Sequence, residues 1–488
     1  MLRYVPLMDY SDSELSRLDS VGLAEAIRSG EISASEAVQA SIDRIESLDN
    51  KLNAVVTTRF ERALEDAKGD IPDGPFKGVP FLLKDLWTCS AGEPMHLGNK
   101  ALKESNYISP IESDLARRYR EAGFIVIGRT NTPEFGLVGT TEPESYGPCR
   151  NPWNADYGTG GSSGGAAAAV ASGMVPSANA SDGGGSIRIP AAMCGLVGLK
   201  PSRGRVPMGP LQEEWGLSIQ HVVSHSLRDT AAILDATALP TLGDGVVAPT
   251  HGQPYMNQVV ANPGKLRIGL WNESPRSELE LHDDCRRLTN EAAALLENLG
   301  HYVDEAHPPA LDDPAIGGRF SAIWMAGANL TLKNVSELIG RELTIEDVEI
   351  GSWLMAEYGA KTSGLDVLRA QAAMGAMRRA TLQWWEEGWD LLLTPTTLQP
   401  PPLIGELTST KDEPMRNSMR SLPYAAYTSP FNATGQPAIS LPTGFTSDGL
   451  PIGIQLVAAY GREDLLFRIG AQIENEIQWS TKRAPIHA

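Results

Sequence analysis

The sequence predicts an α/β fold, because helical and strand patterns alternate along most of its 488 residues. The clearest example is a helical pattern over 114–122 that leads directly into a buried strand at 124–128. A second example is a strand at 265–271 followed by a helix at 283–299. Because this pattern resumes after the loop-rich run 240–263, we expect one sheet to continue through the chain.

The other expected elements follow the same patterns. A helix over 21–28 ends at Gly30, and a second helix begins at Ser33, where Glu36 completes a capping box. In chain order, the remaining elements are a strand at 53–57, a helix at 59–68, a strand within 75–84, a strand at 196–199, a helix at 224–238, a strand at 302–304, helices at 319–338, 344–357 and 365–389, strands at 390–394, 437–442 and 451–457, and a closing helix at 463–476.

The composition indicates a large globular protein that does not bind nucleic acid. Hydrophobic residues make up 42% of the chain and charged residues 21%, with a net charge of −19. Phosphate binding needs clustered Lys and Arg, which this charge argues against. The scattered cysteines Cys89, Cys149, Cys194 and Cys285 have no CxxC spacing, and the histidines form no HExxH motif. We therefore expect no disulfide framework, no metal and no cofactor.

The N-terminus gives no sign of export or membrane insertion. Its first residues, MLRYVPLMDYSDSEL, carry acids where a signal peptide has basic residues followed by an apolar core. A membrane-spanning helix needs about 18 or more apolar residues in a row, and the sequence has no such run. We expect a cytoplasmic protein without a membrane partner.

The most informative stretch is the glycine-rich segment 158–190. Two clusters, GGSSGG at 160–165 and GGGS at 183–186, bracket a segment predicted to form one short helix and one strand. Glycine lets a substrate approach the backbone, so that consecutive N–H groups can converge on an oxyanion. A serine beside such donors is the arrangement that acyl transfer requires. The alternative is a flexible linker, but linkers are polar and the run Ala166 to Ala171 indicates burial.

This stretch resembles the signature of the amidase signature family, serine hydrolases that use a Ser-Ser-Lys triad. In the family pattern the first serine of GGSSGG is the bridging serine, and the serine that ends the later cluster is the nucleophile. These positions correspond to Ser162 and Ser186. The family lysine lies in a G-V-P-x-x-x-K-D pattern, which residues 78–85 match, so Lys84 is the third candidate. The resemblance spans roughly residues 20 to 480.

The resemblance implies a fold and a division of the chain. The expected architecture is a large, mixed, mostly parallel central sheet sandwiched between layers of helices, built as a single domain over residues 1–488. Within it we expect N-terminal helices over 1–60, a catalytic core over 75–240, a helical region over 311–389 that covers the substrate, and a return to the sheet over 390–488.

The resemblance also implies hydrolysis of a carboxamide through an acyl-enzyme. Neutral Lys84 would take a proton from Ser162, and Ser162 would take one from Ser186. A lysine that follows three apolar residues is costly to bury with its charge, so its pKa should fall. In the family the peptide bond before the bridging serine is cis, which corresponds to Gly161–Ser162 here.

Further residues have expected supporting roles. The oxyanion hole would consist of the backbone N–H groups of Gly183, Gly184, Gly185 and Ser186. Asp182 and Arg188 are expected to form a buried charge pair that holds this loop, and Ser163 to stabilise it by hydrogen bonding. The chain departs from the family pattern T-D-x-G-G-S at Ser181 and Gly183.

The substrate is expected to be a neutral, apolar amide or lactam, with water as the second substrate. Candidate binding residues are Trp324, Met325 and Trp353 in the helical region, although aromatic residues and Met at helical spacing more often belong to a core. Asn131, in the segment RTNTPEF, is either a binding residue or a structural loop residue. A homodimer is a further expectation from the family.

Several alternatives remain open at this point. A glutamine amidotransferase A subunit shares the triad and supplies ammonia to a partner. An esterase uses the same acyl-enzyme chemistry, and a non-catalytic binding protein can keep the fold. The presence of Lys84, Ser162 and Ser186 together argues against the non-catalytic alternative.

Overall fold

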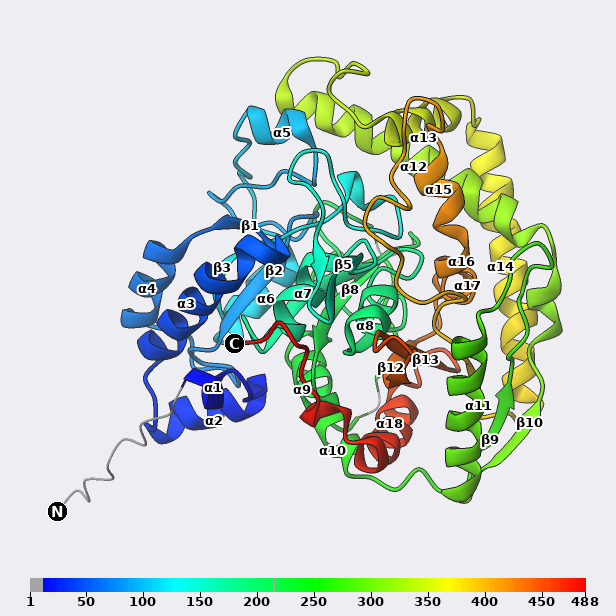
Figure 1. Ribbon diagram of the computed structural model, residues 1–488. Helices are drawn as coiled ribbons and strands as arrows, with labels where there is room; N and C mark the ends of the chain where they lie inside the picture. The colour runs from blue at the N-terminus through cyan, green and yellow to red at the C-terminus, as the bar shows by residue number, and fades with distance from the viewer. Residues whose placement is uncertain (1–11, 214–215, 251) are drawn as a thin grey trace.

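The central element of the molecule is one large sheet. The computed structural model describes residues 12–213, 216–250 and 252–488. Within these residues, eleven strands form the sheet. Strands β4 (Arg150–Asn151) and β5 (Asn154–Gly158) form a separate hairpin. Figure 1 shows β1 to β3 on one side of the molecule and β9 and β10 on the other. The strand order is β1 (Val55–Thr58), β3 (Ile125–Thr130), β2 (Pro80–Lys84), β6 (Ser177–Asp182), β8 (Ile219–Ser224), β7 (Val197–Lys200), β12 (Ala438–Phe445), β13 (Pro451–Ala458), β11 (Leu391–Pro395), β9 (Arg267–Leu270) and β10 (Tyr302–Glu305).

The sheet is mixed, and the predicted α/β class is confirmed. Four of its ten adjacent pairs are parallel, namely β2–β3, β2–β6, β9–β11 and β9–β10, and the other six are antiparallel. These pairings correct the expectation of a mostly parallel sheet. One reason is that β12 and β13 are joined by residues 446–450 alone, a connection too short for parallel strands. Another is β8, which the sequence patterns do not predict and which pairs antiparallel with β6 and β7.

Helices cover both faces of the sheet, and alternate side chains of a strand enter different cores. On β2, Phe81 and Leu83 belong to one apolar cluster, whereas Leu82 belongs to the cluster on the other face. The first cluster packs under α2 (Ser20–Ser29), α6 (Asp114–Glu121), α9 (Leu227–Thr237), α10 (Tyr255–Val259) and α18 (Glu463–Ile477). The second packs under α3 (Ala34–Leu52), α4 (Phe60–Lys68), α7 (Gly164–Ala171) and α8 (Arg188–Cys194). Burial on both faces explains why β2 is continuously apolar before Lys84.

Local signals place several helix ends. The predicted capping box is present, since the Ser33 side chain accepts from the Glu36 N–H at the start of α3. The predicted helix at 283–299 is α11 (Asp283–Asn298). Short helices that the patterns do not predict are α1 (Asp12–Leu15), α5 (Lys100–Glu104), η1 (Glu134–Gly136), η2 (Pro309–Asp312), α15 (Arg416–Arg420), α16 (Leu422–Ala425), α17 (Ser429–Thr434) and η3 (Trp479–Thr481).

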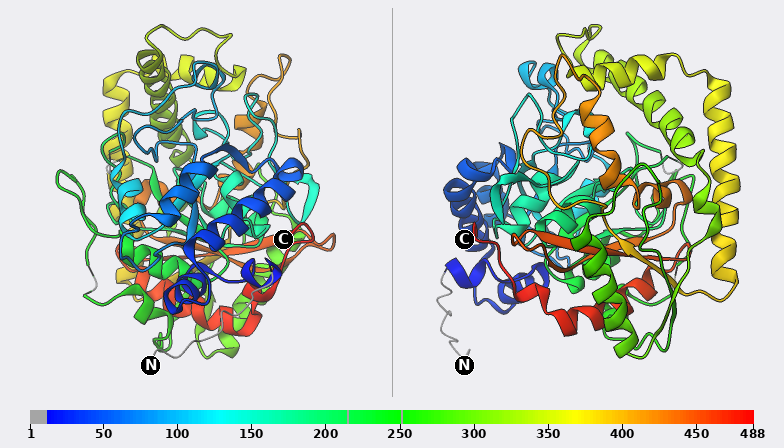
Figure 2. Two further views of the ribbon diagram at one scale, coloured as in Figure 1. Left: turned by 90° about the vertical axis from the view of Figure 1, so that its left-hand side faces the viewer. Right: turned by 45° about the vertical axis from the view of Figure 1, so that its right-hand side comes forward.

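Three helices make up the region predicted over 311–389. They are α12 (Ile316–Ile339), α13 (Ile350–Ala360) and α14 (Gly364–Glu386). Helix α13 begins at Ile350 rather than at 344, because the Asp347 carboxylate accepts from both the N–H and the hydroxyl of Thr344 and holds a turn there. Figure 2 shows α14 as a long helix at the outer edge of the molecule.

The strands before and after the loop-rich run 240–263 belong to the same sheet. We therefore propose that the chain forms a single domain. None of the helices in the described part of the chain combines the length and the apolar character needed to span a bilayer.

Glu134 joins the core to the helical region. It follows β3, and its Oε1 accepts from Asn99 Nδ2 at 2.7 Å while its Oε2 accepts from the Glu349 N–H at 2.9 Å, directly before α13. Burial raises the pKa of Glu134 to about 7. Burial and the nearby Glu134 also raise the pKa of Glu349. Burial thus favours the protonated forms of these two carboxyl groups, which lie between the core and the helical region.

Replacing Glu134 with glutamine is expected to remove a pH dependence of stability. Between pH 4.5 and about 7 the folded protein keeps a proton on Glu134 that the unfolded chain releases. The free energy of unfolding therefore falls as pH rises through this window, by up to ~1.4 kcal/mol per pH unit. Glutamine does not titrate, so the stability difference between wild type and E134Q should shrink as pH rises. Urea unfolding across the window measures this, and a constant difference would contradict it.

Candidate active site

Two neighbouring strands end at the candidate site. Strand β2 ends at Lys84 and β6 ends at Asp182, and the two strands are adjacent and parallel. Because the carboxyl ends of parallel neighbours meet at one edge of a sheet, Lys84 lies beside the loop that follows β6. That loop carries Ser186 just before α8, while Ser162 lies just before α7. The fold thus brings together three residues that are far apart in the sequence.

Lys84 is fully buried, and its amine contacts two hydroxyl groups. Lys84 Nζ lies 2.7 Å from Ser162 Oγ and 2.9 Å from Ser181 Oγ. Burial lowers the pKa of Lys84 well below its usual value, and the charge of Asp182 offsets part of this effect. Burial thus favours the neutral amine, which is the form that can accept a proton.

The two predicted catalytic serines differ in their contacts. The Gly161–Ser162 peptide is cis, as the resemblance implies. Only 2% of Ser162 and 7% of Ser186 is exposed. Over residues 12–213, 216–250 and 252–488, the Ser186 hydroxyl has no hydrogen-bond partner. Contacts of this kind often form only when substrate binds, so Ser186 remains available to both Ser162 and a substrate.

The loop after β6 is held by the Asp182 carboxylate. Asp182 Oδ1 accepts from the Gly185 N–H at 2.7 Å, and Oδ2 accepts from the Ile187 N–H at 3.2 Å. Gly185 is therefore removed from the predicted oxyanion hole, because its N–H is already used. The N–H groups of Gly183, Gly184 and Ser186 have no acceptor in the part of the chain that the structure describes. Gly185 adopts φ of +139°, a backbone conformation that favours glycine.

Asp182 and Arg188 form the expected buried pair. Both side chains are completely buried, and Arg188 donates from Nε and Nη2 to the two carboxylate oxygens at 2.9 Å each. Burial alone would raise the pKa of Asp182, but the Arg188 charge outweighs it and lowers that pKa to about 2. A bidentate pair of this kind fixes the loop geometry as well as the charges.

Residues at the start of and within α17, and one in β13, complete the loop support, and the sequence patterns do not identify them. Thr428 Oγ1 donates to the Gly184 carbonyl at 2.6 Å, and Asn432 Nδ2 donates to the Asp182 carbonyl at 2.8 Å. Arg188 Nη1 also donates to Gln455 Oε1 at 2.7 Å. No local motif marks these three residues, because their partners lie more than two hundred positions earlier.

Ser163 and Ser181 are the remaining polar residues at this edge of the sheet. Ser163 Oγ accepts from the Ser181 N–H and donates to the Ser181 carbonyl, each at 3.2 Å. Ser163 therefore holds the backbone, which fits the supporting role expected for it. The sequence marks Ser181 only as a departure from the family pattern and does not predict its contact with Lys84.

Two aromatic residues of α12 lie over the loop. The rings of Phe320 and Trp324 stack with centroids 5.5 Å apart. A Cβ added to Gly183 would lie 2.9 Å from Trp324 Cζ3, and one added to Gly184 would lie 3.3 Å from Phe320 Cζ. Trp324 was predicted near the substrate, whereas Phe320 was not. A side chain at position 183 would therefore require the indole ring of Trp324 to shift.

The other predicted binding residues lie elsewhere. The Met325 carbonyl oxygen lies so close to Gly359 of α13 that a residue with a side chain would not fit at position 359. Trp353 packs against an apolar cluster that contains Leu332 and Val335. Their contact with substrate stays a prediction. The contacts of Asn131 favour the structural alternative, because its side chain is buried and donates to the Asn53 and Gly147 carbonyls.

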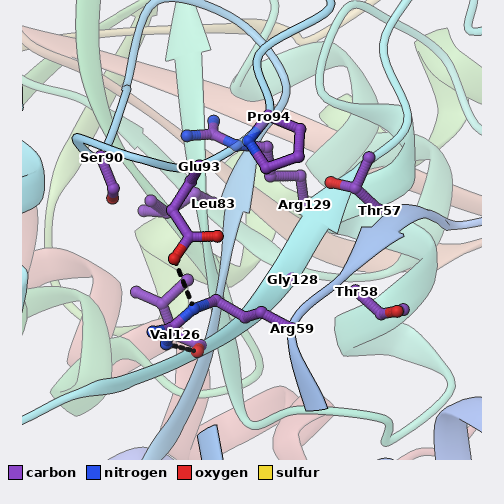
Figure 3. Close-up of a pocket in the computed structure, with 10 residues that line it drawn as sticks. All are labelled: Thr57, Thr58, Arg59, Leu83, Ser90, Glu93, Pro94, Val126, Gly128 and Arg129. Carbon is purple, nitrogen blue, oxygen red and sulfur yellow. Dashed lines mark hydrogen bonds and ion pairs between the residues drawn. The ribbon is translucent and has the colours of Figure 1, made fainter. Parts of the chain in front are cut away.

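A small pocket lies on the other side of β3 and is shown in Figure 3. Arg59 Nε donates to Glu93 Oε1 across it at 3.1 Å. Its lining residues are Thr57, Thr58, Arg59, Leu83, Ser90, Glu93, Pro94, Val126, Gly128 and Arg129. Ser162, Ser186 and Lys84 do not line this pocket, so it is not the candidate active site. The described part of the chain also gathers no group of three or more His, Cys, Asp or Glu residues that could hold a metal ion.

Comparison with known proteins identifies the family. A sequence model described as Amidase matches residues 36–467. The chain belongs to this amidase family. It is 42% identical over 480 residues to a 6-aminohexanoate-cyclic-dimer hydrolase from Paenarthrobacter ureafaciens, an alignment that covers 95% of this chain and 96% of that relative.

Solved structures of amidases share the whole fold. A 6-aminohexanoate cyclic dimer hydrolase complexed with substrate matches this amidase with a TM-score of 0.94 and 41% identity, covering 97% of this chain and all of that chain. A bacterial aryl acylamidase of the amidase signature family matches with a TM-score of 0.85 and 26% identity, covering 95% and 97%. The protein is therefore a hydrolase of carbon–nitrogen amide bonds, with an amide and water as its substrates. The resemblance to the amidase signature family is confirmed.

Proposed function

We propose that this amidase hydrolyses a neutral, apolar amide, linear or cyclic, through an acyl-enzyme on Ser186. The observation that carries the proposal is the 2.7 Å contact between the buried Lys84 amine and the Ser162 hydroxyl. An amine kept neutral by burial is a base that works without histidine. The adjacent loop supports the assignment, because its backbone N–H groups at 183, 184 and 186 are unused by the protein chain that the structure describes.

The reaction begins with a proton relay. Lys84 takes the proton of Ser162, Ser162 takes the proton of Ser186, and Ser186 Oγ attacks the amide carbonyl carbon. The carbonyl oxygen becomes an oxyanion, which the free loop N–H groups stabilise. Each donor of this kind typically contributes about 2.7–4 kcal/mol to lowering the barrier.

The same relay completes the cycle. As the C–N bond breaks, the proton returns from Lys84 through Ser162 to the nitrogen of the leaving amine. A water molecule then loses a proton to the relay and attacks the ester carbonyl of the acyl-enzyme. The C–O bond to Ser186 breaks, Ser186 regains its proton, and the carboxylic acid is released.

The aromatic pair of α12 supports an apolar substrate. Because Phe320 and Trp324 lie against Gly184 and Gly183, a carbonyl bound at this loop has its neighbouring methylene groups beside two rings. Relatives named 6-aminohexanoate-cyclic-dimer hydrolase act on a cyclic amide rich in methylene groups. We therefore propose 6-aminohexanoate cyclic dimer, or a related lactam, aryl amide or acyl amide, as substrate.

Replacing Trp324 with alanine is expected to raise KM for such a substrate about 10-fold or more, because burying a large apolar side chain contributes ~1.5–3 kcal/mol. Steady-state kinetics on the cyclic dimer measure the change. Trp353→Ala is the companion variant, since Trp353 packs in a separate apolar cluster. A rise of KM in W353A but not in W324A would indicate that Trp353, and not Trp324, contacts the substrate.

Product analysis by mass spectrometry tests the function directly. The purified protein is incubated with 6-aminohexanoate cyclic dimer, small aliphatic amides, aryl anilides, long-chain acyl amides and glutamine. Cleavage of the cyclic dimer supports the proposed substrate. Cleavage of another amide alone keeps the mechanism and moves the substrate to that class. Cleavage of glutamine alone would favour an amidotransferase subunit instead.

Two finer expectations rest on the family resemblance. We propose that the protein forms a homodimer and acts in the cytoplasm. Light scattering during gel filtration measures the first, and a monomer mass would contradict it. Cell fractionation measures the second, and recovery in the medium or an envelope fraction would contradict it.

A further inference from the structure

Lys84 Nζ has a second oxygen contact that the proton relay does not use. Ser181 Oγ lies 2.9 Å from Nζ, near the end of β6, and the Ser181 side chain is buried. Two residues earlier, Asn179 Oδ1 accepts from the Lys84 backbone N–H at 3.2 Å. Residues two apart on a strand point to the same face. Strand β6 therefore holds both the backbone and the amine of Lys84.

We propose that Ser181 is a positioning residue that turns the lone pair of the neutral Lys84 amine toward Ser162. The inference rests on the proposed function. A neutral amine has two N–H groups and one lone pair, and it rotates freely about Cε–Nζ unless a partner holds it. When one N–H donates to Ser181 Oγ, the lone pair is directed to the Ser162 hydroxyl, which must donate to it for the relay to begin.

The position of the Ser181 hydroxyl is itself fixed. Strand β6 pairs Ser181 with Gln220 of β8, and Ser163 Oγ bonds to both the N–H and the carbonyl of Ser181. The backbone that carries the hydroxyl is thus held from two sides. Such support is what keeps a catalytic group in its productive geometry.

The charged groups around Lys84 have other partners. Asp182 pairs with Arg188, and α7 carries no ionisable side chain. Arg129 of β3 donates to the Lys84 and Thr88 carbonyls, the Asp85 carboxylate accepts from the His96 N–H, and Arg44 of α3 donates to Ser41. In the described parts of the chain, only Ser162 and Ser181 have a hydrogen bond to Nζ. Ser181 is therefore the group that can orient the amine.

Kinetics of S181A and S181T as a function of pH test the proposal. In S181A we expect kcat to fall about 10-fold or more, because a positioned base contributes 10²–10⁴-fold. KM should change little, since Ser181 acts through Lys84. The acid limb of kcat/KM should move to lower pH, because an oxygen acceptor stabilises the ammonium form and its loss lowers the pKa of Lys84. S181T keeps the hydroxyl, so its kcat and the acid limb of its kcat/KM profile should match those of the wild type.

Controls separate positioning from general loosening of the site. Ser172→Ala removes a buried hydroxyl that donates to the Ala168 carbonyl at the end of α7 and bonds to neither Lys84 nor Ser181, so its acid limb should stay in place. An S181A enzyme with the wild-type kcat and acid limb, or an equal shift of the limb in S172A, overturns the proposal. If circular dichroism shows that S181A does not fold, S181C carries the same test, because its thiol has similar volume and is a weak acceptor.

The test is separable from the proposed function. Turnover that persists in S186A would refute the acyl-enzyme itself. Turnover that is lost in S186A but unchanged in S181A would refute only the role of Ser181.

Discussion

Replacing Ser186 with alanine is expected to abolish amide hydrolysis. The variant keeps the backbone N–H groups that bind the oxyanion but has no oxygen to attack the carbonyl. Loss of a triad nucleophile typically lowers kcat by about 10⁴-fold or more and leaves only the contribution of binding and the oxyanion hole. Acid quenching during turnover, followed by intact-protein mass spectrometry, should show an acyl adduct on the wild type and none on S186A.

A matched control is Ser163→Ala, which removes a nearby buried hydroxyl that bonds only to the Ser181 backbone. This variant should retain an acyl adduct during turnover. If S186A instead hydrolyses the amide at the wild-type rate, Ser186 is not the nucleophile and the proposed mechanism is wrong.

Replacing Arg188 with methionine is expected to lower the free energy of unfolding by about 3–5 kcal/mol, because it leaves the buried Asp182 carboxylate without its charge partner. The pair is completely buried, so water cannot replace the lost guanidinium. Urea unfolding measures the loss. The exposed pair of Lys333 and Glu342, 3.4 Å apart, offers a control, since K333M should change stability by less than about 1 kcal/mol.

The double variant D182N/R188M separates the two contributions. It removes the unpaired charge, so it should be more stable than R188M alone. Equal stability of R188M and K333M would show that the buried pair does not hold the fold.

The sequence predicts the part of the site that depends on local order. Lys84 ends an apolar strand, and Ser162 and Ser186 lie in glycine clusters that each precede a helix, so all three stand in local motifs that the family resemblance can match. Asp182 and Arg188 lie six residues apart, close enough for one motif to contain both. Strands β2 and β11 were also found, because burial on both faces gives each of them an apolar run.

Other features depend on directions and long-range contacts that a linear pattern does not contain. The glycine cluster predicts four N–H donors, but only the position of the Asp182 carboxylate reveals that Gly185 is already bonded. The sequence alone does not show whether the Asn131 amide binds substrate or donates to two backbone carbonyls, as it does in the structure. Two of the six antiparallel pairs involve β8, which the sequence patterns do not predict because its residues include the polar Gln220 and His221.

The support that Arg188 receives from the end of the chain has a consequence for synthesis on the ribosome. Domains generally fold as units, with N-terminal parts emerging first. Arg188 finds the Thr428 carbonyl only after 240 further residues and Gln455 after 267. Until then the loop that contains Ser186 lacks these contacts with the C-terminal part of the chain. The nascent polypeptide therefore carries an incompletely supported loop through most of translation, and we expect hydrolytic activity to begin only after β13, which contains Gln455, has joined the sheet.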